Sequence, residues 1–298
     1  MCRDRIEYFK DAFKSILYQE ESDIVGMKIL VSDNSIGKDV ENFLKDNYPN
    51  ENYLYIRRNP PVSIMEHYQL IFNDIDEEYT IMFHDDDLMK PYFIKHISNY
   101  LPKNGIAAVS CNAVICKRVI KESGIKSFSD SDNILFNTKT EFFKRYLPGS
   151  SGQAPYPAYL YNSNYLKQTK FLPLPNGSCD DVAMISSMLD FGSILWLKND
   201  LMYYRVHQNS NTEVEGIMER IILMRYMIKN GLDRSLDSIA LFRCEYWARW
   251  ICKQPLSELS QRKNKVVAIH LVKKLMFFLR KKIFWRVIFT RIFNFFKG

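Results

Sequence analysis

Helical and strand-like segments alternate, with short links, over about the first 111 residues of the chain, and this order limits the folds open to it. Residues 5–19 place apolar side chains on one helical face, and residues 28–32 form a short apolar run before a polar turn. The same reasoning predicts helices at 38–47, 64–75 and 91–101, and strands at 52–57, 79–84 and 105–111. This order is typical of an α/β fold with a mainly parallel sheet flanked by helices. Ligands of such sheets bind beyond the carboxyl ends of the strands, so the polar turns there are the candidate sites.

The rest of the chain is less regular. Residues 112–178 show no clear period, and the segment 147–163, with three prolines among Gly, Ser and Tyr, is typical of a functional loop. After it we expect a helix at 180–191, strands at 193–198 and 201–207, and only helices from about residue 214. We therefore predict a first domain over residues 1–212 and a helical extension over residues 213–298.

Composition excludes several classes of protein. No glycine-rich phosphate loop or dinucleotide fingerprint occurs, and no apolar stretch reaches the roughly 18 residues that a membrane span needs. No signal peptide is recognisable, and the six cysteines form no Cys-x-x-Cys pair, which is typical of reduced thiols in a cytosolic protein. We therefore expect a cytoplasmic protein.

The carboxyl-terminal tail differs in charge from the body. Residues 259–298 contain eleven Lys and Arg and no acidic residue, whereas the residues before them hold more acidic than basic side chains. Phe, Ile, Leu and Trp285 are mixed with these cations, although the two kinds do not separate on a helical wheel. The tail therefore predicts contact with an anionic surface, and we favour a membrane at its cytoplasmic face over nucleic acid.

Three consecutive carboxylates close an apolar strand at Asp85, Asp86 and Asp87. Such neighbours repel one another unless a cation lies between them, and a divalent ion with oxygen ligands meets that need. Because Mg²⁺ and Mn²⁺ usually bind through one or two carboxylates plus substrate phosphates, the run favours a phosphorylated ligand. The alternative is a solvated acidic turn.

Three further strand or helix ends carry polar side chains. Asp33 follows the strand at 28–32 and can accept hydrogen bonds from a ribose or a base, although a self-capping turn is the simpler alternative. Asp180 and Asp181 open a helix, where one serves as a cap and the other is a candidate general base. His207 ends the last strand and can bind a metal or a diphosphate oxygen, although most lone histidines do neither.

The order and spacing of these strings resemble family 2 glycosyltransferases of the GT-A type, including those that make bacterial surface polysaccharides. In chain order the similar strings are a first nucleotide-binding turn at 28–39, Arg57-Arg58-Asn59, an Asp-x-Asp strand and turn at 79–91, the pair Asp180-Asp181, and a Tyr-Arg-x-His element at 204–207. The resemblance covers residues 3–210. It implies a GT-A fold and transfer of a sugar, with inversion, from a nucleoside diphosphate donor to an acceptor hydroxyl.

The resemblance also implies a role for each candidate residue. It assigns Asp86, Asp87 and His207 to Mn²⁺ or Mg²⁺, assigns Asp33, Arg58 and Asp85 to the nucleotide, and makes Asp181 the general base with Asp180 as the alternative. The acceptor is expected to be a saccharide or a lipid-linked saccharide. Within the loop 147–163, the side chains that could stack on a sugar are Tyr156, Tyr159 and Tyr161, with ordinary packing as the alternative.

The chain departs from the family at three places. His84 stands where the first Asp of Asp-x-Asp is expected, so Asp85 or Asp87 is the substitute carboxylate. The acidic pair is Asp-Asp, where Glu-Asp is usual. Cys2-Arg3-Asp4-Arg5 occupies the place of the opening turn without the apolar strand that normally precedes it, which suggests an incomplete amino terminus.

Two rival functions remain open. A nucleotidyltransferase that makes sugar nucleotides would also use a parallel sheet and metal-bound aspartates, but it should have a glycine-rich first loop, which is missing here. A non-catalytic homologue that binds nucleotide sugars is the second rival, because of His84 and the missing strand. No recognised nucleic-acid-binding module occurs, so we expect no nucleic-acid partner.

Overall fold

The structure, a computed structural model, describes residues 1–19, 26–101, 105–116, 124–147, 150–172, 180–207, 217–234, 239–240, 242 and 285. The chain forms two compact units. The first contains Met1–Asn137, Gln153–Phe171 and Met184–Ser210, and the second contains Thr138–Gly152, Leu172–Ala183 and Asn211–Gly298. The domain boundary expected near residue 212 stays a prediction.

A small parallel sheet opens the first unit. Strand β1 (Ile29–Asp33) pairs with β2 (Tyr53–Arg57), and Asp33 lies opposite Arg57 at the carboxyl end. Cys2 makes an isolated parallel bridge to Asp33 on the other side of β1, with Cys2 N donating to Ser32 O at 3.0 Å. Three chain segments therefore end together at one edge of this sheet.

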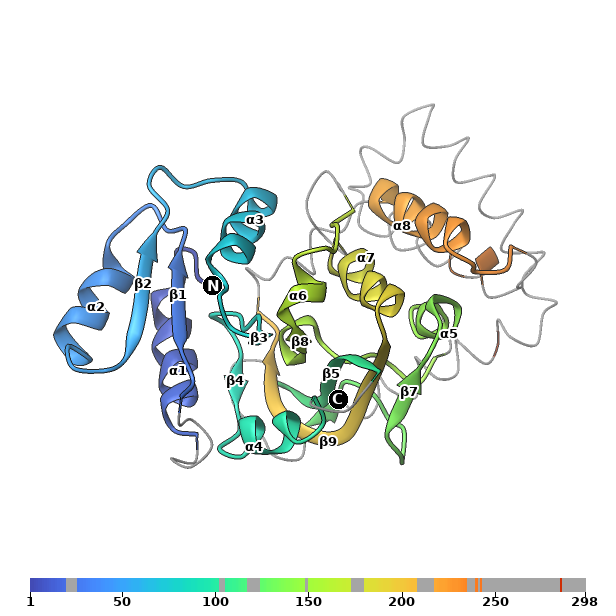
Figure 1. Cartoon of the computed structure of the whole chain (residues 1–298), viewed down its shortest axis with the longest axis horizontal. Coiled ribbons are helices and arrows are strands. Elements are labelled where there is room, and N and C mark those ends of the chain that lie inside the picture. The colour runs from blue at the N-terminus through green and yellow to red at the C-terminus, as the bar shows by residue number, and fades with distance from the viewer. Residues whose placement is uncertain are drawn as a thin grey trace. The chain divides into compact units, whose positions relative to one another are not determined.

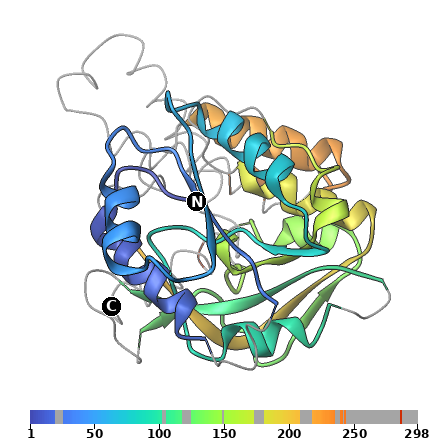
Figure 2. The same ribbon diagram turned by 60° about the vertical axis from the view of Figure 1, so that its left-hand side comes forward.

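Two amphipathic helices cover a face of the small sheet. Helix α1 (Ile6–Leu17) and helix α2 (Asp39–Asn47) lie side by side in Figures 1 and 2, and Phe9 of α1 meets Phe43 of α2 edge-on, with ring centroids 6.2 Å apart. Phe13 is 1% exposed and packs in the same core as Val31. Burying each such side chain contributes about 1.5–3 kcal/mol, so the helical spacing of these residues fixes which face of α1 turns inward.

Helix α3 (Ile64–Asp74) follows β2 and begins at a side-chain cap. The hydroxyl of Ser63 accepts a hydrogen bond from Glu66 N at 3.3 Å, which satisfies one of the free backbone donors of the first turn. The helix buries His67, which is 2% exposed, together with apolar neighbours. The helix thereby places the imidazole of His67 next to β1.

The second sheet of this unit is mixed. Its strands run in the order β3-β8-β5-β9-β4, with β6 on β5 and β7 on β9. Their bounds are Tyr79–Ile81 (β3), Leu88–Met89 (β4), Ile106–Cys116 (β5), Ile125–Lys126 (β6), Ile134–Phe136 (β7), Leu160–Asn162 (β8) and Ser193–Arg205 (β9). The long strands β5 and β9 pair in parallel, while the other pairs in this sheet are antiparallel.

The predicted α/β class is confirmed, and in this second sheet the parallel pairing is that of β5 with β9, whereas the short strands pair antiparallel. Residues 112–178, which show no period in the sequence, supply the end of β5 and the short strands β6, β7 and β8. Strands of two or three residues are too short to display an alternating pattern, and antiparallel partners need no long crossover connection. The two strands expected at 193–198 and 201–207 form one continuous strand, β9.

The second sheet has its own apolar core. Helix α4 (Phe93–Ser98) packs against it, with Phe93 and Ile97 both 0% exposed beside Val109 of β5 and Met202 of β9. Tyr159 and Tyr161 are also 0% exposed, and their rings stack with centroids 5.5 Å apart. Ordinary packing, the alternative to sugar stacking, therefore accounts for these two tyrosines.

The remaining elements are short or belong to the second unit. They are the 3-10 turns Tyr156–Ala158 and Met188–Asp190, and helices α5 (Lys139–Lys144), α6 (Ser163–Leu166), α7 (Asp180–Ser187) and α8 (Ile217–Lys229). Helix α8 is a described part of the predicted helical extension, whereas the basic tail 259–298 lies outside the described residues except for Trp285. Among the described helices, none combines the length and the apolar character that crossing a bilayer requires.

Candidate active site

The acidic turn lies between two strands of the mixed sheet and is buried. Asp85, Asp86 and Asp87 follow β3 and lead directly into β4, and their exposed fractions are 3%, 7% and 1%. The alternative of a solvated acidic turn is therefore wrong, because water reaches little of these side chains. Three buried carboxylates are costly unless cations and donors surround them.

Arg5 supplies the first counter-charge. Its guanidinium makes ion pairs with Asp85 and with Asp86, and the backbone N of Arg3 donates to Asp85 Oδ2 at 3.0 Å. Burial raises the pKa of Asp85 above its ordinary value, and the guanidinium only partly opposes that rise. The turn at residues 2–5 thus reaches the acidic turn from more than 80 residues away in the sequence.

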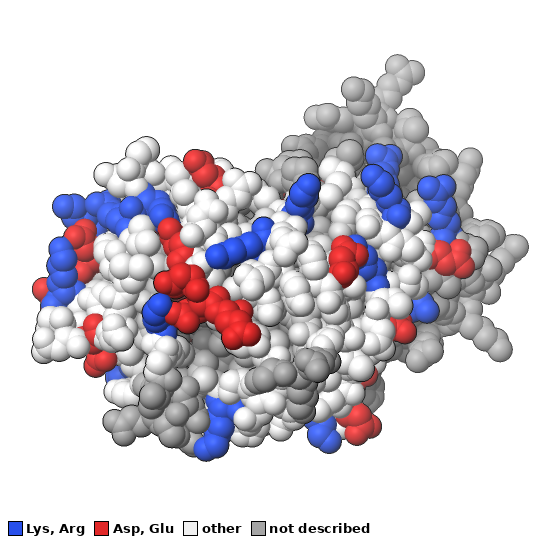
Figure 3. Space-filling model, viewed as in Figure 1, with Lys and Arg blue, Asp and Glu red and all other residues white. Residues whose placement is uncertain are grey.

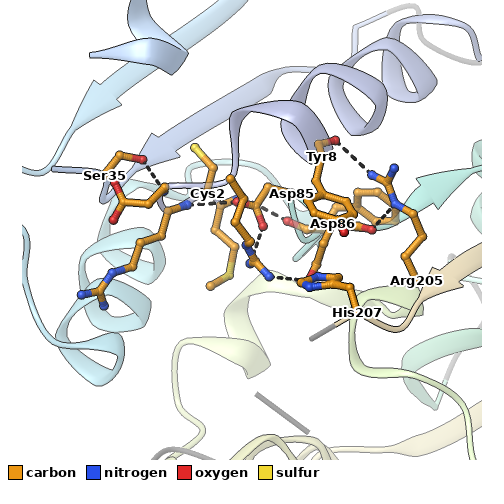
Figure 4. Close-up of polar contacts among 12 residues, drawn as sticks. Cys2, Tyr8, Ser35, Asp85, Asp86, Arg205 and His207 are labelled. Carbon is orange, nitrogen blue, oxygen red and sulfur yellow. Dashed lines mark hydrogen bonds and ion pairs between the residues drawn. The ribbon is translucent and has the colours of Figure 1, made fainter. Parts of the chain in front are cut away.

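His207 contacts the same carboxylate as Arg5. Its Nε2 lies 3.0 Å from Asp86 Oδ2, and its ring stacks on Tyr8 with centroids 4.4 Å apart. Burial acts to raise the pKa of Asp86, but His84, Arg5 and His207 outweigh it, so that the pKa falls below its ordinary value. Figure 4 shows Asp86 between the amino-terminal segment and the end of β9.

Arg205 ties the acidic turn to α1. Its backbone N donates to Asp87 Oδ1 at 2.9 Å, and its Nε donates to the backbone O of Asp86. The guanidinium also bonds Asp11 Oδ2 at 2.9 Å and Tyr8 O at 3.0 Å, and it lies over the Tyr8 ring (Figure 4). One side chain, 8% exposed, therefore satisfies acceptors in two separate segments.

We expect Arg205→Met to destabilise the protein by about 2–4 kcal/mol, because backbone acceptors of Tyr8 and Asp86 would lose their charged donor inside the fold. The midpoint of urea unfolding measures the effect. Arg225→Met, which removes an exposed guanidinium from α8, is the matched control. Equal midpoints for the two variants would show that Arg205 does not hold the turn.

Three buried atoms at the acidic turn have no hydrogen-bond partner. They are His84 Nε2, Asp86 Oδ1 and Asp87 Oδ2, each of which is inaccessible to solvent and makes no hydrogen bond. One ligand atom from each residue lies within 4.8 Å of the others. Burial and the Asp86 charge raise the pKa of Asp87 well above its ordinary value, and burial lowers the pKa of His84 to about 4.

This arrangement fits a divalent cation. Unpaired buried oxygens and a neutral imidazole nitrogen are ligands that such ions accept, and a cation would stabilise the charge that burial opposes. Asp86 and Asp87, two of the three residues predicted to bind a metal, contribute atoms to the cluster. His207 contacts Asp86 instead, and His84, known from the sequence only as a departure from Asp-x-Asp, takes the third place.

Asp33 lies at the end of β1 and is fully buried. Its Oδ2 accepts a hydrogen bond from the Tyr55 hydroxyl at 2.8 Å and its Oδ1 accepts one from Ser35 N at 3.0 Å. Burial and the Asp33 carboxylate raise the pKa of Tyr55. The self-capping turn considered for this residue is therefore present, and the nucleotide contact stays a prediction.

The amino-terminal turn is docked on the loop after β1. Asp4 N donates to Ser35 Oγ at 2.8 Å, and Asp4 Oδ1 accepts from Ile36 N at 2.9 Å. Asp4 has a φ of 51°, a left-handed conformation that Asp tolerates better than most residues with a side chain. These bonds hold the turn that carries Arg5 to the acidic cluster.

Arg58 belongs to a buried network behind β1. Its Nε donates to Ser32 Oγ at 3.1 Å, its Nη2 pairs with Asp74, and Ser32 Oγ lies 2.8 Å from His67 Nε2. Burial lowers the pKa of His67 to about 4, so the ring is neutral at pH 7. The predicted contact between Arg58 and the nucleotide is not tested by this geometry.

The two candidates for the general base, Asp180 and Asp181, lie in the second compact unit. Asp180 and Asp181 are the first residues of α7, and Asp180 is 3% exposed. The choice between them stays a prediction.

Acidic side chains gather on one face of the molecule. Figure 3 shows them as a band, bordered by Lys and Arg, in the part of the view where the amino terminus lies in Figure 1.

The sequence indicated the carboxylates of the acidic turn but missed the roles of Arg5 and Arg205. The Tyr-Arg-x-His string contained Arg205, and the opening turn contained Arg5, yet neither motif tells which carboxylate an arginine will meet.

Comparison with known proteins supports the fold. No model of a protein family matches the chain, and no curated protein sequence does. TarS 1-349 of S. aureus in complex with UDP-GlcNAc has a TM-score of 0.59 at 12% identity, over 89% of this chain and 76% of that chain. The mannosyltransferase PcManGT from Pyrobaculum calidifontis, in complex with GDP-Man and Mn²⁺, has a TM-score of 0.54 at 11% identity, over 100% of this chain and 86% of that chain. The predicted fold class is thereby confirmed.

Proposed function

We propose that the chain is a metal-dependent glycosyltransferase that uses a nucleoside diphosphate sugar as donor. The observation that carries the proposal is the cluster of His84, Asp86 and Asp87 at a strand end of this fold, with one ligand atom of each residue within 4.8 Å of the others and one buried, unpaired atom on each. Similar folds bind UDP-GlcNAc in TarS and GDP-Man with Mn²⁺ in PcManGT, which supports a donor of this class.

We assign residues to the metal and to the nucleotide by their positions in the fold. Asp86 and Asp87 would hold Mn²⁺ or Mg²⁺, and His207 and Arg5 orient Asp86 through its second oxygen. The metal, when bound, stabilises the negative charge that develops on the leaving diphosphate. Asp33, Arg58 and Asp85 are the proposed nucleotide side of the site, because they lie at or beside the carboxyl ends of β1, β2 and β3.

The acceptor side rests on the resemblance to family 2 transferases. Asp181, with Asp180 as the alternative, would take the proton from the acceptor hydroxyl as its oxygen attacks the anomeric carbon. A single displacement of this kind inverts the configuration at that carbon. The basic, apolar tail 259–298 supports an acceptor at a membrane surface, such as a lipid-linked saccharide, in polysaccharide or glycolipid synthesis.

A thermal-shift panel tests the donor site. UDP, GDP, CDP and dTDP are each added with and without Mn²⁺, and a ligand that binds only the folded state raises the Tm. We expect one nucleotide to raise the Tm by several degrees only when Mn²⁺ is present, which would also identify the base for donor searches.

The same panel, extended with the corresponding nucleoside triphosphates, also separates the rival functions. A shift with a nucleoside triphosphate larger than with any diphosphate would favour a nucleotidyltransferase. A metal-dependent diphosphate shift without any cleavage of the matching sugar nucleotide would favour a non-catalytic binding protein. No shift with any nucleotide would contradict the proposed function.

A further inference from the structure

His84 stands at the position where the first Asp of the Asp-x-Asp string is expected, and its surroundings indicate what an imidazole can do there. His84 Nε2 is inaccessible to solvent and has no hydrogen-bond partner, although the residue as a whole is partly exposed. Its ring lies against Tyr156, with centroids 5.2 Å apart at 50°. A buried ring nitrogen without a protein partner is uncommon in a folded protein.

The two neighbouring carboxylates each have one oxygen without a hydrogen-bond partner, and both residues lie in one cluster with His84. Asp86 Oδ2 is engaged by Arg5 and by His207, which leaves Oδ1 as its unpartnered oxygen. Asp87 Oδ1 accepts from the backbone N of Arg205, which leaves its Oδ2. Groups that orient ligands through their other atoms are typical of built metal sites.

The balance of nitrogen and oxygen ligands decides which cation such a site prefers. Mg²⁺ and Ca²⁺ bind oxygen ligands, whereas an imidazole nitrogen is a good ligand for first-row transition ions. For a given set of N and O ligands, affinity rises from Mn²⁺ to Co²⁺ along the Irving–Williams order. A carboxylate at position 84 would instead give a site made of oxygens alone.

We propose that His84 Nε2, Asp86 Oδ1 and Asp87 Oδ2 together bind a divalent transition metal, and that the His84 nitrogen makes the site prefer Co²⁺ and Mn²⁺ to Mg²⁺. The proposal deepens the proposed function, since this cation is the one that the transferase would use. His207, the histidine that the family resemblance assigns to the metal, acts here through Asp86 as a positioning residue.

Pulsed EPR of Mn²⁺ added to the full chain without nucleotide tests the ligand directly, because a bound imidazole nitrogen modulates the signal. We expect this modulation in the unchanged protein and in His207→Asn, and its loss in His84→Asn. Asp86→Ala should lose tight Mn²⁺ binding altogether, which shows that the ion sits in the cluster. Absence of Mn²⁺ binding by the unchanged protein, or modulation lost only in His207→Asn, would overturn the proposal.

Competition between cations tests the preference. We expect the ratio of Co²⁺ to Mg²⁺ affinity to fall about 10- to 100-fold in His84→Asp, a change of the size seen when metal-site residues are altered. His84→Asn provides a second variant without a further buried charge, should His84→Asp fold poorly. His96→Asp, at an exposed position of α4, is the matched control and should leave the ratio unchanged. An unchanged ratio in both His84 variants would contradict the role of His84.

The two proposals fail in different ways. Neither EPR nor cation competition uses a nucleotide, so a chain without transferase activity could still pass both tests. A metal-dependent nucleotide shift that is equally large with Mg²⁺ and Co²⁺, and without nitrogen modulation, would support the transferase and sink the His84 proposal alone.

Discussion

Asp86→Ala is expected to reduce glycosyl transfer at least about 10³-fold, a loss on the order of 4 kcal/mol of transition-state stabilisation. Among the three carboxylates of the turn, only Asp86 contacts both Arg5 and His207 and also belongs to the proposed metal-binding cluster. Its loss would remove the anchor of the cation and one of the acceptors that Arg5 and His207 contact. The measurement is the rate of nucleoside diphosphate release from the donor that the thermal-shift panel identifies.

The control for Asp86→Ala is the same substitution at an aspartate outside the proposed metal site. Asp76→Ala removes an exposed carboxylate that pairs with Lys28, and we expect its rate to equal that of the unchanged protein. Circular dichroism of both variants checks that they fold. Transfer at the normal rate by folded Asp86→Ala would show that the metal assignment is wrong.

Asp181→Asn is expected to lower transfer by about 10²–10⁴-fold while the nucleotide-induced rise in Tm stays unchanged. An amide has nearly the shape of the carboxylate but cannot accept the acceptor proton, so binding of the donor and its transfer should separate. Comparing the Tm shift with the rate of transfer to acceptor distinguishes this role from loss of folding.

Two further variants decide between neighbours. Asp180→Asn should keep most of the activity, because the proposed base is Asp181, and Asp190→Asn, at an exposed position, should keep all of it. A large loss in Asp180→Asn with a normal rate in Asp181→Asn would move the base to Asp180. Full activity in both would place the base outside this pair.

The acidic turn shows how far the sequence reaches. Its position at a strand end could be predicted from the apolar run that precedes Asp85, Asp86 and Asp87, and affinity for a cation stays a prediction. The sequence could not show that Asp86 Oδ1 and Asp87 Oδ2 stay unpaired while the opposite oxygens are engaged. That difference arises from Arg5, His207 and Arg205, which approach from distant parts of the chain.

The fold divides in the same way. Local sequence patterns predicted α1 to α4 and β1. In segments such as 5–19 and 28–32, apolar side chains stand at the positions that the helix or strand buries, so the pattern is visible within the segment itself. The direction of strand pairing in the second sheet was decided by the tertiary structure. Strands such as β6 and β8 have two or three residues, and only their partners define them.

Local chemistry therefore determined which side chains stand at the strand ends, and the tertiary structure decided what each of them can do. His84 illustrates the physical reason. In the sequence it is a missing carboxylate, whereas in the fold one of its ring nitrogens lies within 4.8 Å of a carboxylate oxygen from each of Asp86 and Asp87. Whether a buried polar atom finds a partner depends on chain segments brought together across 80 to 120 residues, as Arg5 and Arg205 are around Asp86, and no local pattern records that meeting.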